Sequence, residues 1–452
     1  MEFKDKKVIV YGSGISGQAA AKLLLAKGAS VLLYDENEKI DREELLLQFE
    51  DTTGLTLVIG ALDAAQKQAD LLVVSPGIPL DNPLVTEYKA SGLPVIGEVE
   101  LAYRCQKGEV YAITGTNGKT TTTTLLGEIM QACYADTRVV GNIGIPYAGR
   151  VADSQESTKL VAEISSFQLE TIDTFCPKVS AILNITPDHL NRHHTMENYI
   201  AAKLRIAENQ TAADYCVLNY DDESLREAAD SIPATVVWFS STRKLDRGIW
   251  LDGDKICYND GSGTVELVST GELNILGRHN HENAMAASVM ALLAGVPAET
   301  IRQVLRTFRA VEHRIEFVTE KKGVRFYNDS KGTNPDAAIK GILSMDRPTF
   351  LIAGGYDKES DYAGWISYFP GRVKKLVLIG QTKEKIAAAA QAQGFDAYVY
   401  ADSLNEAVSL CYKEAVPGDA VLLSPACASW GMFPNYEVRG RMFKELVHAL
   451  KE

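Results

Sequence analysis

The sequence predicts an α/β protein of three domains: a Rossmann-like N-terminal domain, a central domain of the P-loop ATPase type and a C-terminal Rossmann-like domain. Apolar runs typical of strands alternate with helical patterns along most of the chain, as in parallel sheets covered by helices. Two glycine-rich segments, 12–17 and 115–120, each lie between such a strand and a helix. With 452 residues, the chain is also too long for a single hydrophobic core.

The expected joints lie near residues 97 and 311, which gives domains 1–97, 98–311 and 312–452. The first domain alternates strand and helix patterns at 8–11, 15–26, 30–34 and 71–74, and a helical pattern at 98–105 follows it. The second has strand patterns at 109–112, 160–163 and 179–183, a polar β-rich insertion around 236–272, and helices at 280–293 and 298–308. The third has strand patterns at 349–353, 375–379, 397–400 and 421–423.

The first loop, Gly12 to Gly17, matches G-x-G-x-x-G, and Asp35 ends the next strand. On the motif alone we favour a nicotinamide dinucleotide, with Asp35 on a ribose hydroxyl. A UDP-linked ligand satisfies the same physics, because the motif requires only a diphosphate at a helix N-terminus. Ser75 opens a second loop that we expect at the same edge of the sheet.

The second loop, residues 113–121, reads Ile-Thr-Gly-Thr-Asn-Gly-Lys-Thr-Thr and predicts a phosphate-binding loop. Its glycines allow backbone N–H groups to approach phosphate oxygens at the start of a helix. Lys119 is expected to reach the β/γ-phosphates, and the Thr120 hydroxyl to bind Mg²⁺. Ile113 stands where the usual pattern has a glycine, so the loop is a variant. The alternative is an ordinary strand–turn–helix.

Further polar residues follow strands of the central domain. Glu163 ends an apolar strand, where a carboxylate can share Mg²⁺ with a P-loop threonine. The alternative is a strand-end glutamate in solvent. Asp188 and His189 lie in a polar run at 184–194, which is expected at the same sheet edge. Nothing in the composition singles out Lys203, which would by default be an exposed lysine on a helix.

Two loops of the third domain also follow strands. Residues 328–335 form a polar loop with Asn334 as the expected N-cap and Pro335 in the first turn of a helix. Residues 423–430 carry small side chains after another strand. Both loops are expected at the binding edge of an open α/β sheet, although ordinary turns have similar compositions.

The bulk composition excludes several classes of protein. The formal net charge of −13 argues against nucleic-acid or anionic-membrane partners, which attract basic surfaces. The seven scattered cysteines are typical of reduced thiols rather than of disulfides or a zinc site. No uncharged apolar run is long enough for a membrane span, and no signal peptide is expected. We therefore expect a soluble, cytoplasmic protein.

Taken together, these motifs resemble those of the Mur ligase family, ATP-dependent amide-forming enzymes of peptidoglycan precursor synthesis. The residues that carry the resemblance are 115–121, 163–168, 188–190, Lys203, 277–280, 312–314 and 329–331. Within the family, the nucleotide-sugar type of first domain and the runs at 328–334 and 424–429 resemble the members that add D-glutamate to UDP-N-acetylmuramoyl-L-alanine. The resemblance implies phosphorylation of the alanyl carboxylate by ATP and attack of the D-glutamate amine on the acyl phosphate.

The resemblance also implies the site residues. The three domains would bind the UDP-substrate, ATP and the amino acid, in that order. For ATP it implies Gly115, Thr116, Asn117, Gly118, Lys119, Thr120, Thr121, Asn283, Arg314 and Asp329. For the UDP-substrate it implies Gly14, Ile15, Ser16, Asp35, Ser75, Asn142 and Ser165, and for D-glutamate Thr333, Lys358, Ser429 and Tyr436. Two Mg²⁺ ions would be held by Thr120 with Glu163 and by His189 with a carbamylated Lys203. The implied catalytic residues are Lys119, Asn142, His189 and Lys203.

Three alternatives remain open at this point. A nicotinamide-dependent oxidoreductase would use the loop at 12–17 but would leave Lys119 and Glu163 without a role. A P-loop nucleotide sensor would bind ATP without ligating anything. A different ligase of the family, including the folate-polyglutamate branch, would take another amino acid. We expect a monomer that binds only small-molecule substrates.

Overall fold

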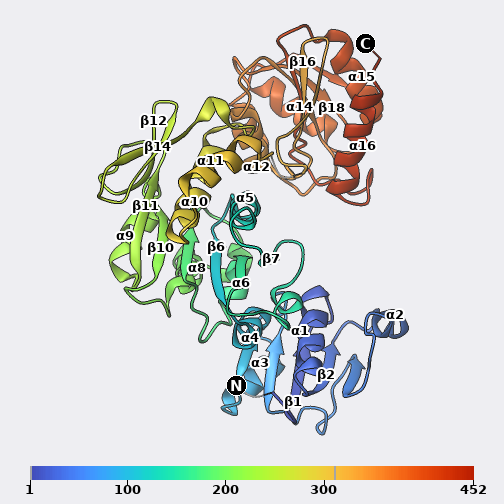
Figure 1. The fold of residues 1–452 in the computed structure, drawn as a ribbon. Coiled ribbons are helices and arrows are strands. Elements are labelled where there is room, and N and C mark those ends of the chain that lie inside the picture. The colour runs from blue at the N-terminus through green and yellow to red at the C-terminus, as the bar shows by residue number, and fades with distance from the viewer. Residues whose placement is uncertain (1–2, 310–311, 452) are drawn as a thin grey trace. The chain divides into compact units, whose positions relative to one another are not determined.

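The computed structural model describes residues 3–309 and 312–451, which form two compact units. One unit comprises Met1–Ser269 and Glu282–Leu305, and the other comprises Thr270–His281 and Arg306–Glu452. Three mainly parallel sheets, two in the first unit and one in the second, confirm the predicted class of three α/β domains (Figure 1). The predicted joint at residue 311 lies outside the described residues.

The N-terminal sheet has five strands in the order β3-β2-β1-β4-β5, and every pairing in it is parallel. Its strands are β1 Lys7–Tyr11, β2 Ser30–Asp35, β3 Leu55–Ile59, β4 Leu71–Val74 and β5 Val95–Gly97. Its helices are α1 Ile15–Ala26, α2 Arg42–Leu46 and α3 Pro83–Ala90. The strand order reverses between β1 and β4, and the loops after these two strands meet at the carboxyl edge of the sheet, where Ser75 Oγ donates to Gly12 O.

The central sheet has nine strands in the order β14-β13-β12-β11-β10-β9-β6-β8-β7. Its strands are β6 Glu109–Thr114, β7 Thr137–Gly141, β8 Lys159–Glu163, β9 Val179–Ile182, β10 Tyr215–Asn219, β11 Thr235–Ser240, β12 Gly248–Asp252, β13 Lys255–Asn259 and β14 Thr264–Ser269. The pairings from β7 to β12 are parallel, whereas β12, β13 and β14 form an antiparallel meander. This meander lies within the β-rich insertion predicted from the sequence.

The helices that accompany the central sheet are α4 Glu98–Cys105, α5 Lys119–Gln131, α6 Ser166–Leu169, α7 Leu190–His193, α8 Met196–Leu204, α9 Glu223–Ala228, α10 Arg278–Leu293 and α11 Ala298–Thr307. Short 3₁₀ turns lie at Tyr147–Arg150, Arg205–Ala207, Ala229–Ser231 and Thr270–Glu272. Helix α4 joins the two sheets of the first unit. The buried Glu100 carboxylate accepts hydrogen bonds from the backbone N–H groups of Asp173, Thr174 and Phe175, which fixes α4 to the central domain.

The sheet of the second unit has six strands in the order β15-β16-β20-β17-β18-β19, with β15 antiparallel to β16. Its strands are β15 Glu316–Lys321, β16 Val324–Asn328, β17 Thr349–Ala353, β18 Val373–Leu378, β19 Tyr398–Tyr400 and β20 Ala420–Leu423. Its helices are α12 Pro335–Leu343, α13 Ala363–Ile366, α14 Lys383–Ala392, α15 Leu404–Glu414 and α16 Tyr436–Ala449. Asn334 caps α12 by accepting the N–H of Ala337, as predicted.

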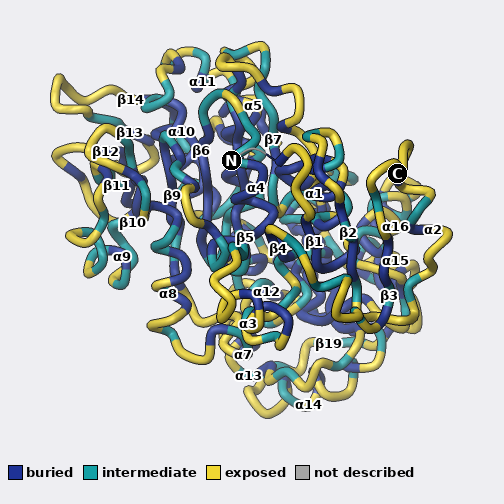
Figure 2. Tube along the Cα trace, turned by 90° about the horizontal axis from the view of Figure 1, so that it is seen from below, coloured by how far each residue is buried: buried dark blue, intermediate teal, exposed yellow. Residues whose placement is uncertain are grey.

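Apolar side chains on the central strands of each sheet form the cores, and many connecting loops are exposed (Figure 2). Several of the predicted site residues lie in such loops, which a rigid sheet positions. Within the described residues, no helix has the length and hydropathy that crossing a membrane would require.

Candidate active site

The predicted phosphate loop connects β6 to α5. Gly118 caps α5 with φ +88°, and a Cβ atom there would lie 2.2 Å from Asn283 Oδ1. Only glycine meets both the left-handed conformation and this close approach. The first N–H groups of α5 have no partner within the helix, and together with the helix dipole they form an anion-binding site. The loop therefore has the backbone geometry that phosphate binding requires.

Asn283 is the one predicted nucleotide contact outside the loop that shares this unit. Its side-chain oxygen accepts a hydrogen bond from Thr122 Oγ1 at 3.3 Å. Together with the approach to Gly118, this bond places Asn283 against the first turn of α5.

Glu163 lies at the carboxyl end of β8, and its register partner in β6 is Ile113, the residue that begins the phosphate loop. Its side chain is 2% exposed, so the alternative of a strand-end glutamate in solvent is wrong. Asn142 Nδ2 donates to Glu163 Oε1 at 2.8 Å. The other oxygen, Oε2, is buried and has no hydrogen-bond partner among the described residues. An unpartnered buried carboxylate oxygen, on the strand beside the one that leads into the phosphate loop, fits a divalent cation.

Lys203 lies on α8 with only 1% of its surface exposed, so the interpretation as a solvent-exposed helix lysine is wrong. Its Nζ donates to the carbonyl oxygen of Gly115 at 2.8 Å, and no carboxylate in the described part of the chain pairs with it. Burial, and after it the nearby Lys119 ammonium, lowers the pKa of Lys203 to about 6. Lys203 is therefore a largely neutral, nucleophilic amine at pH 7.

Lys119 shares the same carbonyl oxygen. Its Nζ donates to Gly115 O at 2.9 Å and to Thr116 O at 3.1 Å. Burial lowers the pKa of Lys119, and the negative charges of Glu163 and Asp188 oppose that shift. Two lysines that converge on one carbonyl, with carboxylates nearby, form a site suited to anionic substrates and cations.

His189 lies at the N-cap of α7 in a left-handed conformation, with φ +53°. Its side chain is 49% exposed, and Nε2 lies 3.5 Å from Asp188 Oδ2. The imidazole also lies against the Phe167 ring, with ring centroids 4.9 Å apart. The structure thus places His189 on the loop after β9, at the sheet edge that carries the phosphate loop, without a direct contact to Lys203.

The predicted UDP site lies at the carboxyl edge of the N-terminal sheet. Asp35 Oδ2 accepts hydrogen bonds from the Ser13 N–H and hydroxyl, both at 2.8 Å, while Ser75 Oγ donates to Gly12 O at 3.1 Å. A Cβ atom on Gly14 would meet nothing within 4 Å, so the N-terminus of α1 is open.

A cavity of about 630 Å³ adjoins this edge and is lined in part by Gly14 and Asp35. Ile15 is 71% exposed and Ser16 is half-buried. The structure therefore brings Gly14, Asp35 and the Ser75 loop together at an open helix N-terminus. Ser165 belongs to the central domain, where it caps α6 and forms a capping box with Gln168.

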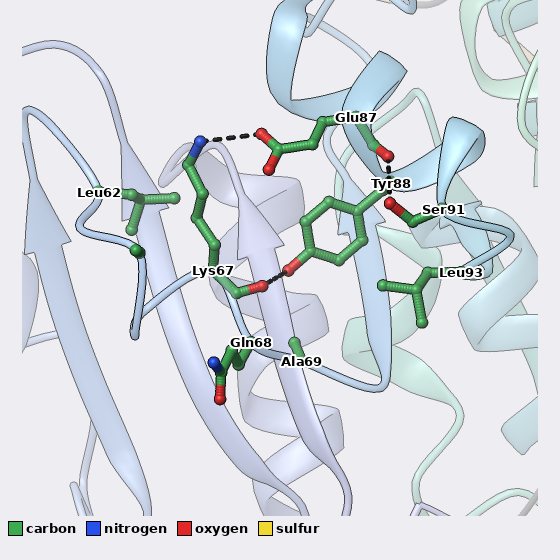
Figure 3. A pocket seen from close by; sticks show the side chains of 9 residues that line it. Leu62, Lys67, Gln68, Ala69, Glu87, Tyr88, Ser91 and Leu93 are labelled. Carbon is green, nitrogen blue, oxygen red and sulfur yellow. Dashed lines mark hydrogen bonds and ion pairs between the residues drawn. The ribbon is translucent and has the colours of Figure 1, made fainter.

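A second hollow in the N-terminal domain, of about 540 Å³, is lined by none of the predicted site residues. It lies between α3 and the segment before β4, where Lys67 pairs with Glu87 and the Tyr88 hydroxyl donates to the Lys67 carbonyl (Figure 3). Lys67, Glu87 and Tyr88 are thus bonded to one another.

In the second unit, the predicted nucleotide contacts Arg314 and Asp329 lie together. Asp329 is fully buried, its Oδ2 accepts the Ser424 hydroxyl at 2.7 Å, and its Oδ1 lies 3.6 Å from Arg314 Nη1. Burial raises the pKa of Asp329 to about 6, although Arg314 and the bond from Ser424 act in the opposite direction. The contacts with Arg314 and Ser424 thus offset only part of the cost of burying the Asp329 carboxylate, which lies in the loop after β16.

Replacing Asp329 by asparagine is expected to change the pH dependence of stability. Because the pKa of Asp329 is raised in the folded protein, its contribution to the free energy of unfolding is fully present below pH 3.8 and is lost as pH rises through about 6. Relative to wild type, Asp329→Asn should gain on the order of 2–3 kcal/mol between pH 3.5 and pH 7, at about 1.4 kcal/mol per pKa unit. Thermal unfolding midpoints across this range, with the exposed Asp336→Asn as control, measure the effect. A wild-type-to-variant difference that does not vary with pH would contradict it.

The four residues predicted for D-glutamate lie in loops at the carboxyl edge of the same sheet or at the start of a helix there. Ser429 is buried after β20, Tyr436 begins α16, and Thr333 follows β16. Lys358 is exposed in the loop after β17, with its ammonium 5.0 Å from the centre of the Trp430 ring. The structure thus positions all four on one sheet edge of the second unit.

The contacts of Tyr199 and of Arg439 around these sites were not predicted. The Tyr199 hydroxyl lies 3.1 Å from Thr116 Oγ1, and Lys203 Nζ lies over the Tyr199 ring. Because Tyr199 and Lys203 are four residues apart on α8, helical spacing could have indicated this pair. Arg439, buried in α16, donates to the hydroxyl and carbonyl of Ser330. Nothing in the local sequence distinguishes Arg439 from an exposed helix arginine.

Known families and proteins match this chain along its length, and the three domain families that match all belong to Mur ligases. Residues 6–97 match the Mur ligase MurD-like N-terminal domain, 113–291 the Mur ligase middle domain and 313–427 the Mur ligase, glutamate ligase domain. The chain is 54% identical over 453 residues to the UDP-N-acetylmuramoylalanine–D-glutamate ligase of Lachnoclostridium phytofermentans, covering 100% of both chains. The ligase of that name from Clostridioides difficile is 46% identical over 452 residues, again with 100% coverage of both chains.

Solved structures share the fold at lower identity. The UDP-N-acetylmuramate-alanine ligase MurC of Thermotoga maritima matches with a TM-score of 0.60 and 18% identity, covering 99% of this chain and 100% of that one. MurF of Thermotoga maritima, solved in complex with ADP, matches with a TM-score of 0.60 and 17% identity, covering 98% and 96%.

Proposed function

The chain belongs to the Mur ligase family, and on this premise we propose that it joins D-glutamate to UDP-N-acetylmuramoyl-L-alanine with conversion of ATP to ADP and phosphate. The reaction belongs to peptidoglycan precursor synthesis. The observation that carries the proposal is the convergence of Lys119, Glu163 and the buried Lys203 beside one phosphate loop. Neither a nicotinamide enzyme nor a passive nucleotide sensor requires that combination.

The reaction has two chemical steps. An oxygen of the alanyl carboxylate attacks the γ-phosphorus of ATP, the bond to the β-phosphate oxygen breaks, and an acyl phosphate and ADP result. The amine of D-glutamate then attacks the acyl carbon, loses a proton and expels phosphate, which leaves the amide. Lys119 and the N–H groups at the start of α5 hold the phosphates and stabilise the charge that develops on them.

The residues present fit the two Mg²⁺ ions that the family implies. Thr120 and the unpartnered Glu163 Oε2 would hold one ion, and His189 with a carbamylated Lys203 would hold the other. When bound, these ions neutralise the charge of two anions that must meet. Asn142 fixes the rotamer of Glu163 through its bond to Oε1 and leaves Oε2 available.

The surroundings of Lys203 support carbamylation of its amine. A buried lysine without a carboxylate partner is costly to protonate, and a neutral amine attacks CO₂. Loss of one proton from the product leaves a carbamate, whose oxygens are suited to Mg²⁺ whereas an ammonium is not. The modification thus turns a poorly solvated lysine into a metal ligand.

The remaining site residues divide among the three substrates. Gly14, Ile15, Ser16, Asp35 and Ser75 would hold the UDP moiety at the N-terminus of α1, with Asn142 and Ser165 near its alanyl end. Arg314, Asp329 and Asn283 would contact the nucleoside of ATP. Lys358, Thr333, Ser429 and Tyr436 would hold D-glutamate, with the Lys358 ammonium as partner of a carboxylate. The domain limits 1–97, 98–311 and 312–452 and a monomeric state belong to this proposal.

Ligand choice by the unmodified protein tests the proposal against its alternatives. We expect UDP-N-acetylmuramoyl-L-alanine to bind without ATP and to be displaced by UDP, because the cavity at Gly14 and Asp35 offers a diphosphate site. NAD should not compete. Titration calorimetry measures both. Binding of NAD but not of the UDP-sugar would favour an oxidoreductase, and binding of ATP alone would favour a nucleotide sensor.

A further inference from the structure

Arg192 links the N-terminal domain to the loop that carries His189. Its Nη2 donates to the carbonyl oxygen of Ile78, in the loop after β4, at 3.1 Å. The same nitrogen pairs with Glu170 Oε2 at 2.7 Å. Arg192 and Glu170 are both largely buried, with 16% and 18% of their side chains exposed. An arginine that bonds a carboxylate and a backbone carbonyl from two domains holds both in a fixed geometry.

The guanidinium of Arg192 also stacks on Phe167. Its central carbon lies 5.0 Å from the centre of the Phe167 ring, and the His189 ring centroid lies 4.9 Å from the centroid of the same phenyl ring. The exposed His189 thus lies against the Phe167 ring and close to the Asp188 carboxylate. A displacement of Arg192 is therefore transmitted to His189 through one aromatic ring.

His193 continues this set of contacts toward the phosphate loop. Its ring nitrogens lie 3.4 Å from Glu170 Oε1 and 2.9 Å from Ser166 Oγ, and its ring packs against Tyr199. The Tyr199 hydroxyl in turn reaches Thr116 in the phosphate loop. An unbroken series of contacts thus joins Ile78 of the N-terminal domain to both predicted cation-binding regions.

We propose that Arg192, held by Glu170, is a positioning residue that couples seating of the UDP-substrate on the Ser75–Ile78 loop to placement of His189. The inference rests on the proposed function, because it assigns the substrate and the ion to those two loops. In this arrangement, binding of the UDP-substrate fixes the loop after β4, and Arg192 then holds Phe167 and His189 in the geometry that the cation requires. By linkage, Mg²⁺ increases the affinity for the UDP-substrate by the same factor by which the UDP-substrate increases the affinity for Mg²⁺.

Truncation of Arg192 is expected to leave the fold intact. A cavity of about 400 Å³, lined by Leu80, Glu170, Arg192 and residues of α8, lies beside the guanidinium. Removing the side chain therefore enlarges an existing solvent-accessible space instead of opening a void in an apolar core.

The test is calorimetric titration of UDP-N-acetylmuramoyl-L-alanine into wild-type, Arg192→Ala and Arg192→Lys proteins, with and without Mg²⁺ and without ATP. We expect Arg192→Ala to raise the Kd about tenfold without Mg²⁺, because the loop after β4, no longer held by Arg192, must be ordered when the substrate binds. The factor by which Mg²⁺ lowers the Kd should fall toward one. Arg192→Lys, which keeps the charge but not the fork, should restore part of the affinity and little of the Mg²⁺ effect.

Arg302→Ala is the matched control. Arg302 donates to the Glu299 carboxylate and to the carbonyl oxygens of Glu266 and Leu267, away from the site. An unchanged Mg²⁺ factor in Arg192→Ala, or an equal loss in Arg302→Ala, would overturn the inference. If the wild-type protein binds the UDP-substrate and Arg192→Ala changes neither the Kd nor the Mg²⁺ factor, only this inference is contradicted. If the wild-type protein does not bind the UDP-substrate, the proposed function is contradicted.

Discussion

Replacing Lys203 by alanine is expected to lower kcat by about 10²–10³-fold, and a short carboxylic acid such as acetate or formate should restore part of the loss. The alanine variant removes the amine that would carry the carbamate, together with the oxygens that the carbamate offers to Mg²⁺. A small carboxylate can enter the space that the lysine side chain leaves and supply equivalent oxygens. Steady-state phosphate release as a function of carboxylate concentration measures the rescue.

If Lys203 is a metal ligand, a carboxylate should restore activity to the Lys203 variant and have no effect on a variant of another lysine. Lys413 is exposed on α15, and Lys413→Ala should retain wild-type activity with no response to acetate. Dialysis of wild-type protein against CO₂-depleted buffer should lower activity, and bicarbonate should restore it. Full activity of Lys203→Ala, or a loss that no carboxylate reverses at unchanged thermal stability, would contradict carbamylation of Lys203.

Replacing Glu163 by glutamine is expected to lower kcat by about 10²-fold or more and to raise the Mg²⁺ concentration needed for half-maximal activity. Glutamine has almost the same shape, and its amide oxygen can still accept the bond from Asn142 Nδ2. The amide nitrogen that replaces Oε2 cannot ligate a cation. The change therefore removes the charge and one ligand while the packing around β8 is kept.

Glu109 provides the control for this substitution. Glu109 is the first residue of β6, at the end of the strand away from the phosphate loop, and its carboxylate pairs with Lys159 Nζ at 2.5 Å. Glu109→Gln should affect stability by about 1 kcal/mol or less and leave the Mg²⁺ dependence unchanged, because a partly exposed pair contributes little. A Glu163→Gln variant with the Mg²⁺ dependence of wild type would show that Glu163 does not bind the cation.

Local spacing was sufficient to predict the phosphate loop but not the exact start of its helix. The nine residues 113–121 carry their own geometry, since glycines, lysine and threonine act through adjacent backbone. Helix α5 begins at Lys119, within the motif itself. Gly118 ends the left-handed turn and caps the helix, so the helix starts immediately after it. Threonine-rich first turns hide this start because threonine has a weak helix propensity.

The burial of Lys203 could not be predicted from the sequence. Its helix, α8, packs so that Lys203 Nζ reaches the carbonyl oxygen of Gly115, 88 residues earlier in the chain. Such a contact depends on the order of the strands in the sheet, which places the loops after β6 and β9 side by side. Only the resemblance to the family singled out Lys203 beforehand. The contact of Arg192 with Ile78 was equally hidden, because it joins two domains.

The most direct test of the proposed function is phosphate release from ATP in the presence of UDP-N-acetylmuramoyl-L-alanine, Mg²⁺ and bicarbonate, with a panel of amino acids. The panel comprises D-glutamate, L-glutamate, L-alanine, L-lysine and diaminopimelate. We expect release with D-glutamate alone, since the family, the phosphate loop and the Lys358 loop together indicate that substrate. Release with another member of the panel would move the protein within its family. Absence of release with every amino acid would contradict the ligase function itself.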